Sequence, residues 1–466
     1  MMRLNTGGTV SGQAKNAGQP RQSRTSPVKC ALALAGLFLL SACGRSETDR
    51  DTERLAQAAN PAGLSPGKGG LSRIVASGAF AAVTADESRA AEIGRDILQA
   101  GGNATDAAVA MYFAMAVTLP SAASLGASGA CIVHNDKTKA AEAFVFPPVA
   151  APGAVGGQPF IVPGGVRAIT LMHVRHGQQR WEATVAPAER LARLGVPVSR
   201  ALARDAAAGG GALSDREARR LFGSLAEGTT LVQNELAGTL GAIRQRGGAD
   251  FFQGPLARTI SEQVSLMGGS LPVESLRAAV PQASAPAGES YGMRRRVYVA
   301  PPPAAGALAM AGWKGQAPTG PTPTDSGGFS GLAAVDGKGG AAACTLSMGQ
   351  LFGARAVIPG VGVLLGAATP DAGSVSPLII ANPGNGEFTF VGAGGGAATA
   401  AQATGAVARA TVENDQALAT VLGQRRGQGG WVNAIVCPSG LRSDPATCRS
   451  AIDPAGAGLA LVASGF

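Results

Sequence analysis

Aromatic and charged residues are scarce in this chain. Of its 466 residues, 4% are aromatic and 15% are charged, while 45% are hydrophobic. That balance suits a globular protein with a buried core and excludes wholesale disorder. Because Phe, Tyr and Trp are so few, the core must be built from Ala, Val, Leu and Ile. The 68 Gly and 29 Pro residues show no three-residue period, which excludes a collagen-like fibre.

Histidine is almost absent. The chain contains only His134, His173 and His176, and their spacing does not match a zinc-ligand pattern. We therefore predict neither a metal nor a cofactor. Three histidines would still allow a Ser-His-Asp triad, but no G-x-S-x-G elbow accompanies them.

The net charge of +9 does not indicate a nucleic-acid partner. Five basic residues and no acidic residue fall within residues 1–42, so the rest of the chain carries only +4. No basic stripe is interleaved with aromatic residues, and residues 294–296 are the one dense basic cluster. Such a cluster is usually a solvated surface, and we predict no binding of nucleic acid.

Long hydrophobic runs are also lacking. Residues 31–40 are apolar but too few to cross a bilayer permanently, which is typical of a signal-peptide core. Small residues precede Cys43, as at a bacterial lipoprotein cleavage site. We therefore expect residues 1–42 to be a signal peptide and Cys43 to be lipidated. The alternative is an ordinary secretory signal with an incidental cysteine.

The segment after the anchor predicts how the protein is held. Residues 43–72 are polar and contain Pro and Gly, so they are expected to form a flexible tether. The protein should then lie on the periplasmic side of a bacterial membrane. Gly44, in place of Asp, favours sorting to the outer membrane.

The other cysteines leave one pairing open. Cys131 and Cys344 lie in apolar, strand-like runs and are expected to be buried small hydrophobic residues. Cys437 and Cys448 flank a polar loop and could form a disulfide in an oxidising compartment. The sequence does not decide this pairing.

Hydrophobic periodicity predicts helices and strands along residues 73–246. The apolar stripes, caps and turn residues indicate these elements, in chain order: strand 74–76, helix 86–99 with Asp86 as N-cap, buried helix 105–117, strands 130–134 and 140–146, and helices 186–194 and 236–246.

The last third of the chain favours antiparallel strands. Residues 314–328 are turn formers without periodicity and are expected to form an exposed linker. Two hairpins are predicted after it, followed by a glycine-rich turn (392–396) and a helix from about residue 397; the hairpin strands are 330–335 with 341–348 and 378–381 with 388–391. This mixture predicts helices packed on stacked antiparallel sheets.

Several segments, taken in chain order, resemble the gamma-glutamyltransferase (gamma-glutamyltranspeptidase) family. The closest match is residues 91–110, AEIGRDILQAGGNATDAAVA. The other matching segments are 120–129, 163–164, 175–177, 188–195, 249–253, 301–303, 335–345 and 392–396. Together they cover most of residues 73–465.

The resemblance implies the fold and chemistry of the N-terminal nucleophile (Ntn) hydrolases. That fold is an α+β, four-layer αββα sandwich with two stacked antiparallel sheets between helical layers. A family precursor cuts itself, and the freed α-amine of the new N-terminal residue can act as base for its hydroxyl. Here the resemblance implies a large-subunit-like region (73–329) and a small-subunit-like region (330–466) that complete one sandwich.

The family register implies a set of catalytic residues. The nucleophile position falls at or next to Ser330, directly after the predicted linker. The two glycine amides that stabilise the tetrahedral intermediate match Gly395 and Gly396.

The substrate-binding residues match the family only in part. Asp371 matches the acidic position, Ser374 a serine contact, and Ser347 a neighbouring threonine. Val145, however, matches the arginine position, and Gly349 matches an asparagine. Because valine has no donor for a carboxylate, glutathione is disfavoured, and a more open and more apolar pocket is expected.

Two functions remain open. The first is an exported, lipid-anchored Ntn hydrolase or acyltransferase that cuts itself before Ser330. It would act on a small amide or peptide (gamma-glutamyl-type) bond, with hydrolysis favoured. The alternative is a catalytically inactive homologue that serves as a periplasmic binding or scaffold lipoprotein.

Overall fold

The computed structural model describes residues 80–317, 327–425 and 429–463. The expected signal peptide, Cys43, the tether and strand 74–76 lie outside these residues. The chain divides into two compact units, Met1–Gly67 and Lys68–Phe466, and only the second contains described residues. Within the described part, no helix combines the length and apolar character that crossing a membrane requires.

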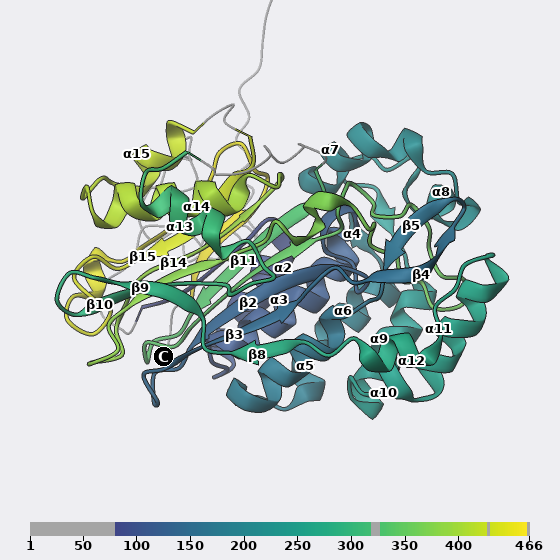
Figure 1. The fold of residues 1–466 in the computed structure, drawn as a ribbon, viewed down its shortest axis with the longest axis horizontal. Helices are drawn as coiled ribbons and strands as arrows, with labels where there is room; N and C mark the ends of the chain where they lie inside the picture. Colours follow the sequence, from purple (N-terminus) through teal and green to yellow (C-terminus); the bar gives the residue numbers. More distant parts are fainter. Residues whose placement is uncertain (1–79, 318–326, 426–428, 464–466) are drawn as a thin grey trace, which may run out of the picture. The chain divides into compact units, whose positions relative to one another are not determined.

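Two antiparallel sheets form the centre of the fold (Figure 1). The larger sheet has the strand order β17 (Leu459–Ala463), β1 (Ala81–Ala85), β11 (Phe329–Val335), β12 (Ala341–Ser347), β2 (Ser128–His134), β3 (Ala141–Phe146) and β8 (Gln282–Ser284). The smaller sheet has the order β16 (Arg449–Ile452), β15 (Trp431–Val436), β14 (Phe388–Gly395), β13 (Leu378–Ala381), β10 (Arg295–Val299) and β9 (Ala287–Tyr291). Two short ribbons pair β4 (Ala150–Val155) with β5 (Gln158–Ile161) and β6 (Val196–Pro197) with β7 (Thr230–Leu231).

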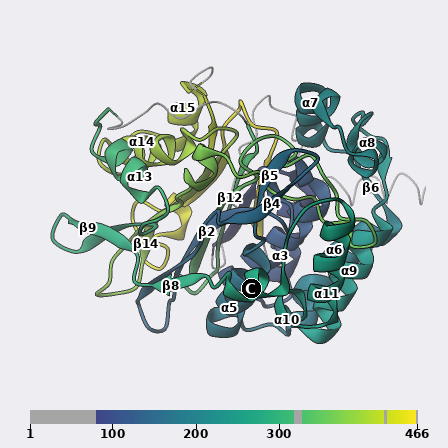
Figure 2. The same cartoon turned by 45° about the vertical axis from the view of Figure 1, so that its right-hand side comes forward.

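Helices cover the outer face of each sheet (Figure 2). On the side of the larger sheet lie α2 (Ser88–Gln99), α3 (Ala104–Thr118), α4 (Pro120–Ala123), α5 (Gly165–His176), α6 (Trp181–Leu194), α7 (Arg200–Gly209), α8 (Arg216–Phe222), α9 (Asn234–Arg246), α10 (Asp250–Gln253), α11 (Pro255–Leu266) and α12 (Val273–Ala278). On the side of the smaller sheet lie α13 (Gly306–Trp313), α14 (Ala400–Val412) and α15 (Leu418–Gly423). Short 3₁₀ turns occur at η1 (Gly210–Ala212), η2 (Pro370–Gly373) and η3 (Pro445–Thr447). The expected four-layer αββα sandwich is confirmed.

The alternation of side chains along β11 explains the layers. Ala333 and Val335 pack between the two sheets, whereas Leu332 and Ala334 pack against the helices. Successive strand residues point to opposite faces, so a strand of small apolar residues can be buried on both. This is why β11 can lie at the centre of the sandwich.

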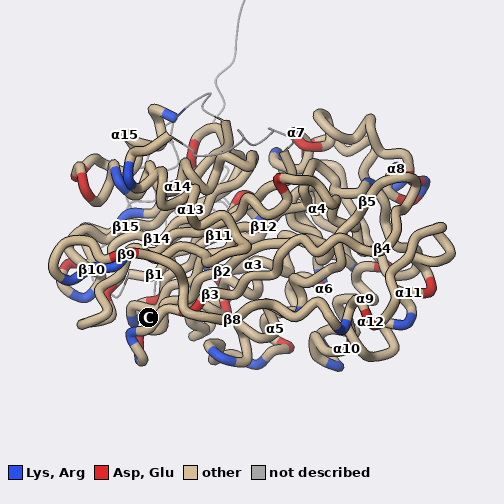
Figure 3. The backbone as a smooth tube through the Cα atoms, viewed as in Figure 1, with Lys and Arg blue, Asp and Glu red and all other residues tan. Residues whose placement is uncertain are grey.

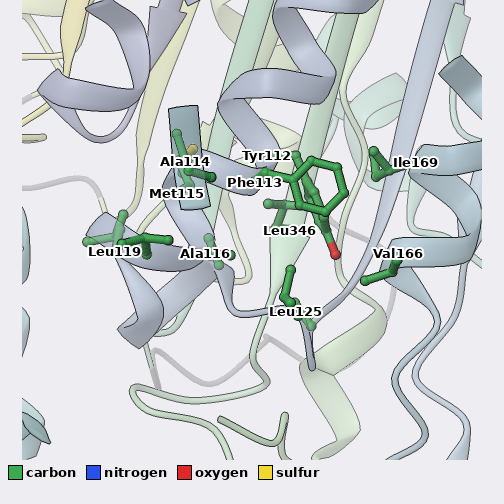
Figure 4. Packing of buried hydrophobic residues seen from close by; sticks show 14 of the residues in the cluster. Tyr112, Phe113, Ala114, Met115, Ala116, Leu119, Leu125, Val166, Ile169 and Leu346 are labelled. Carbon is green, nitrogen blue, oxygen red and sulfur yellow. The ribbon is translucent and has the colours of Figure 1, made fainter. Parts of the chain in front are cut away.

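The helix expected at 105–117 is confirmed as α3, every residue of which is buried. Its aromatic residues pack against the larger sheet and its neighbours, and Figure 4 shows Tyr112 and Phe113 gathered with Leu346 of β12. The Phe113 ring also meets Trp181 edge-on, at 5.5 Å between centroids. Several of the few aromatic residues therefore pack in the core between the larger sheet and the helices that cover it.

The start of α2 differs from the sequence prediction. Glu87, not Asp86, caps this helix, because the Glu87 carboxylate accepts a hydrogen bond from the Ala90 amide at 2.9 Å. Asp86 is turned away to other partners, which are described below. The prediction of Asp86 as N-cap was therefore wrong.

The glycine-rich turn also begins later than expected. β14 continues through Gly395, and α14 begins at Ala400 rather than near Ala397. The run from Gly392 extends as strand because β14 pairs with β15 as far as Gly395 and Trp431. Ladder pairing here outweighs the low strand preference of glycine.

The structure contains two disulfides among its described cysteines. Cys437 and Cys448 are bonded to each other. Cys131 and Cys344 are also bonded, across the directly paired strands β2 and β12. The expected burial of these last two cysteines is confirmed. Their bond to each other was not predicted, because sequence periodicity does not show which strands are neighbours.

The expected small- and large-subunit-like regions both supply strands to the larger sheet. β1, β2, β3 and β8 precede residue 329, while β12 and β17 follow it.

Basic and acidic residues are interspersed over the fold (Figure 3).

Candidate active site

The expected nucleophile lies at the start of a central strand. Ser330 is the second residue of β11 and is completely buried. Its register partner in β12 is Leu346. The Ser330 hydroxyl donates a hydrogen bond to the carbonyl oxygen of Ala122, in α4, at 3.1 Å. Since α4 belongs to the helical layer, the hydroxyl points away from the smaller sheet.

The two expected oxyanion glycines lie directly beside this strand. A side chain at Gly395 would approach the Cα of Ser330 to 3.0 Å, so the two backbones are in contact. Gly396 adopts a left-handed φ of 81°, which favours glycine. The Gly396 amide donates a hydrogen bond to the carbonyl oxygen of Phe329 at 2.7 Å. That carbonyl belongs to the peptide bond preceding Ser330.

Asp86 joins this site, although its sequence position indicated a helix cap. Its Oδ2 accepts the Gly331 amide at 2.7 Å, and its Oδ1 accepts Trp431 Nε1 and Asn433 Nδ2, each at 2.6 Å. The carboxylate also lies against Gly395, where an added side chain would collide with it. Asp86 therefore contacts the residue after Ser330 and one of the glycines.

Burial changes the acidity of Asp86. Desolvation raises its pKa to about 6, against the opposing effect of the hydrogen bonds from Gly331, Asn433 and Trp431. The charge of Arg204 also acts to lower this pKa. No sequence motif marks Asp86, because its partners come from strands far apart in the chain.

A cavity opens next to the glycines. The Arg204 guanidinium lies over the Trp431 ring, 4.3 Å from its centroid, and also donates to Asp205. Asp205 is held in turn by the Ser121 hydroxyl at 2.6 Å. The cavity has a volume of about 250 Å³, and the residues that line it include Arg204, Asp205, Gly328, Phe329, Gly396 and Trp431.

The expected substrate-binding residue Ser347 is fully buried at the end of β12. Its hydroxyl accepts the amide of Gly349, the residue at the family's asparagine position, at 3.0 Å. Its carbonyl accepts the Ser128 hydroxyl at 3.3 Å, and the same hydroxyl donates to Ala372 at 3.0 Å. Ser347 therefore stabilises a turn and the neighbouring segment.

Asp371 and Ser374 lie in and directly after η2. Both are half-buried, and the Ser374 amide donates to the Asp371 carbonyl at 2.8 Å. The Ser128 contact to Ala372 ties this turn to the end of β2 and β12. The structure thus brings the expected acidic position, its serine and Ser347 to one end of the larger sheet.

The region around Val145 is buried and apolar. It is an apolar cluster of buried residues: Ala130, Val145, Ala300, Phe329, Val375 and Ala398. Phe329 is only 1% exposed, because its side chain packs within this cluster. This apolar character fits the expectation, and the openness of the pocket relative to other family members stays a prediction.

We name this group of six residues the Phe329 cluster. None of its members carries a charged or hydrogen-bonding side chain. Across residues 80–317, 327–425 and 429–463, no group of three or more His, Cys, Asp or Glu side chains is arranged to hold a metal ion.

Comparisons with known proteins identify relatives of part of this chain. Residues 90–314 match the gamma-glutamyltranspeptidase family model. The chain is 31% identical to the glutathione hydrolase proenzymes of Bacillus subtilis and Escherichia coli, over 47% and 48% of this chain and 41% and 43% of theirs. It therefore spans less than half the length of these curated relatives.

A solved structure matches over much more of the chain. The cephalosporin acylase from Bacillus halodurans superposes with a TM-score of 0.70 and 19% identity, covering 87% of this chain and 99% of the acylase. The fold is that of the Ntn hydrolases. Within this fold, residues 90–314 are similar to the gamma-glutamyltranspeptidase family, and about half of the chain is similar to glutathione hydrolase proenzymes.

Proposed function

We propose that this chain is the precursor of a gamma-glutamyltransferase-like amide hydrolase that cuts itself between Phe329 and Ser330. One observation carries the proposal: the Gly396 amide donates to the Phe329 carbonyl at 2.7 Å, directly beside Ser330. A donor in this position would stabilise the negative charge that develops on the carbonyl oxygen during attack. Removing one such donor typically slows an acyl transfer about 10²–10³-fold.

Self-cleavage requires the hydroxyl of Ser330 to attack the carbon of the Phe329 carbonyl. A C–O bond forms, the C–N bond to Ser330 breaks, and the proton passes from the hydroxyl to the released nitrogen. Water then hydrolyses the ester, leaving a carboxylate on Phe329 and restoring the hydroxyl. The Ser330 hydroxyl must first give up its hydrogen bond to Ala122.

The new α-amine of Ser330 would then serve as the base for later cycles. Its reference pKa of about 8 lets it accept the hydroxyl proton during attack on an amide and return it to the leaving nitrogen. The acyl group is transferred to Ser330 and then to water. Asp86 holds the backbone of Gly331 and faces Gly395, so it is a positioning residue in this scheme.

The two disulfides support export, since disulfides persist in oxidising compartments. We propose that lipidated Cys43 anchors the protein on the periplasmic side of a bacterial membrane, with the outer membrane as the default destination. Replacement of Cys43 by Ala should release the protein from the membrane fraction. Unchanged retention would argue against lipidation.

The second candidate is the inactive binding or scaffold homologue. The complete burial of Ser330 and of the Phe329 side chain favours it, as does valine at position 145. An uncut chain leaves no free α-amine and no space for an acyl group at Phe329. The two functions therefore differ in one measurable event, the cleavage.

The deciding experiment is expression of the full chain, followed by a denaturing gel and N-terminal sequencing. The gel must be reducing, because the Cys131–Cys344 disulfide joins the two expected fragments. A fragment that begins at Ser330, and is lost in Ser330→Ala, supports the hydrolase. A chain that stays intact on incubation supports the scaffold.

A further inference from the structure

From the surroundings of Phe329, we infer that the mature enzyme takes amides whose acyl group is apolar and about the size of a benzyl group. The acyl-binding site is the Phe329 cluster. This inference rests on the proposed function and specifies its substrate class, which differs from a gamma-glutamyl group.

The first step of the argument is positional. In self-cleavage, residue 329 is the acyl group, and its carbonyl oxygen lies at the Gly396 amide. A later substrate must present its own carbonyl to the same hydroxyl and the same amide. Its acyl group therefore extends in the direction that the Phe329 side chain takes now.

The second step concerns what lies in that direction. The Phe329 ring is 1% exposed and packs against Val145, Val375 and three alanines, Ala130, Ala300 and Ala398. Small alanine side chains around one ring leave a space of aromatic size once the ring departs. The site is thus already shaped around a benzyl group.

The third step concerns charge. An α-carboxylate and α-ammonium placed in this cluster would lose their hydration, and none of the cluster side chains can hydrogen-bond to them. An unpaired buried polar group costs about 1–3 kcal/mol, and a charged group costs more. An aromatic acyl group instead buries about 150–250 Å² of surface with no such penalty.

The final step concerns how the site is vacated. Cleavage converts the Phe329 carbonyl into a carboxylate, whose charge is disfavoured next to an apolar cluster. Gly327 and Gly328 precede Phe329 with φ values of 66° and 74°, which permit backbone paths closed to other residues. Phe329 and Gly396 also line the cavity described above, which gives the displaced residue adjacent free volume.

The test uses the protein matured from the full chain and three p-nitroanilides, of phenylacetic acid, acetic acid and gamma-linked glutamate. We expect kcat/KM for the phenylacetyl compound to exceed that for the acetyl compound at least 10-fold. The gamma-glutamyl compound should be the poorest of the three. Preference for the gamma-glutamyl compound by a properly cleaved protein would overturn this inference while leaving self-cleavage intact.

A pocket-filling variant locates the site. Ala300→Leu should lower kcat/KM for the phenylacetyl compound at least 10-fold and for the acetyl compound less than 3-fold. The matched control is Ala278→Leu at an exposed position of α12, which should alter neither. Equal losses on both compounds in Ala300→Leu would overturn the assignment of the pocket. A wild-type chain that remains uncut on the reducing gel would instead overturn the proposed function, and this inference with it.

Discussion

The two sides of the Phe329–Ser330 peptide bond have opposite chemistry. On the serine side, the Asp86 carboxylate gathers the Gly331 amide, Trp431 and Asn433 within 2.7 Å. On the phenylalanine side, the buried Phe329 side chain belongs to a cluster of alanine and valine side chains. Hydrogen bonds hold the backbone on the serine side in place, whereas the side chain on the phenylalanine side is held by apolar packing. In the proposed enzyme, the reacting groups would therefore lie on the serine side of this bond and the acyl-binding site on the phenylalanine side.

The largest expected effect on the free energy of unfolding comes from removing the Phe329 side chain from its apolar cluster. In an uncut Ser330→Ala background, Phe329→Ala should lower the free energy of unfolding by about 3–5 kcal/mol, because it leaves a cavity in a buried cluster. Urea denaturation measures this change. Leu266→Ala, at a 79% exposed position, is the control and should change stability little. A loss below about 1 kcal/mol would show that Phe329 is not packed as described.

The second prediction concerns the hydrogen bond from the Gly396 amide to the Phe329 carbonyl. Gly396→Ala places a side chain at a left-handed φ, where it would collide with the Trp431 ring. The amide should move away from the Phe329 carbonyl, and cleavage before Ser330 should slow about 10²–10³-fold. Time-resolved reducing gels measure the rate.

The control for this variant is Gly238→Ala, because a side chain at Gly238, in α9, meets no atom within 4 Å. Its cleavage rate should equal that of the wild type. If Gly396→Ala cuts at the wild-type rate as well, the Gly396 amide does not stabilise the reaction.

The third prediction concerns Asp86, on the serine side of the bond, and how its pKa makes the stability of the fold depend on pH. The pKa of Asp86 is about 6 in the folded chain, above its ordinary value of 3.8. Between pH 3.8 and 6, Asp86 is protonated in the folded chain but ionised in the unfolded chain. The stabilisation from this proton is therefore fully present below pH 3.8 and is lost as the pH rises toward 6. The total change is about 3 kcal/mol.

Asp86→Asn removes this titration. In the Ser330→Ala background, the stability of the parent relative to Asp86→Asn should decline between pH 4 and 6 and then level off. Urea unfolding at several pH values gives the two curves. A constant difference across that window would mean that Asp86 keeps its ordinary pKa. The variant also loses an acceptor, so it should be less stable than the parent at low pH.

The smallest expected effect concerns Arg204. Its stacking on Trp431 is worth about 0.5–1 kcal/mol, which Arg204→Gln should remove. Because the positive charge of Arg204 lowers the pKa of Asp86, the same variant should move the upper end of the pH window to higher pH. An unchanged window would show that the two groups do not interact. Arg219→Gln, an exposed position on α8, is the control.

Local patterns predicted much of the fold. The buried helix at 105–117, the amphipathic helices ending at 194 and 246, and both hairpins of the last third appear as α3, α6, α9 and the β11–β12 and β13–β14 pairs. Helical and strand periods are local properties, so a single sequence carries them. The predicted cap at Asp86 failed because the Asp86 carboxylate accepts hydrogen bonds from residues distant in the chain, so Glu87 caps the helix instead.

The candidate site was predictable only where a family resemblance supplied the register. That resemblance placed Ser330 together with Gly395 and Gly396, and their backbones do meet. It did not point to Asp86, Trp431 or Asn433, since these residues come from strands separated by most of the chain.

The sequence by itself determined the secondary-structure elements, the apolar interior and the substitution of valine at position 145. The tertiary structure decided that Phe329 fills the space beside Val145 and that Cys131 bonds to Cys344 across paired strands. It also decided that Asp86 faces Gly395. The physical reason is range: periodicity arises from neighbours along the chain, whereas strand order and the packing of one sheet on another join residues that are hundreds of positions apart.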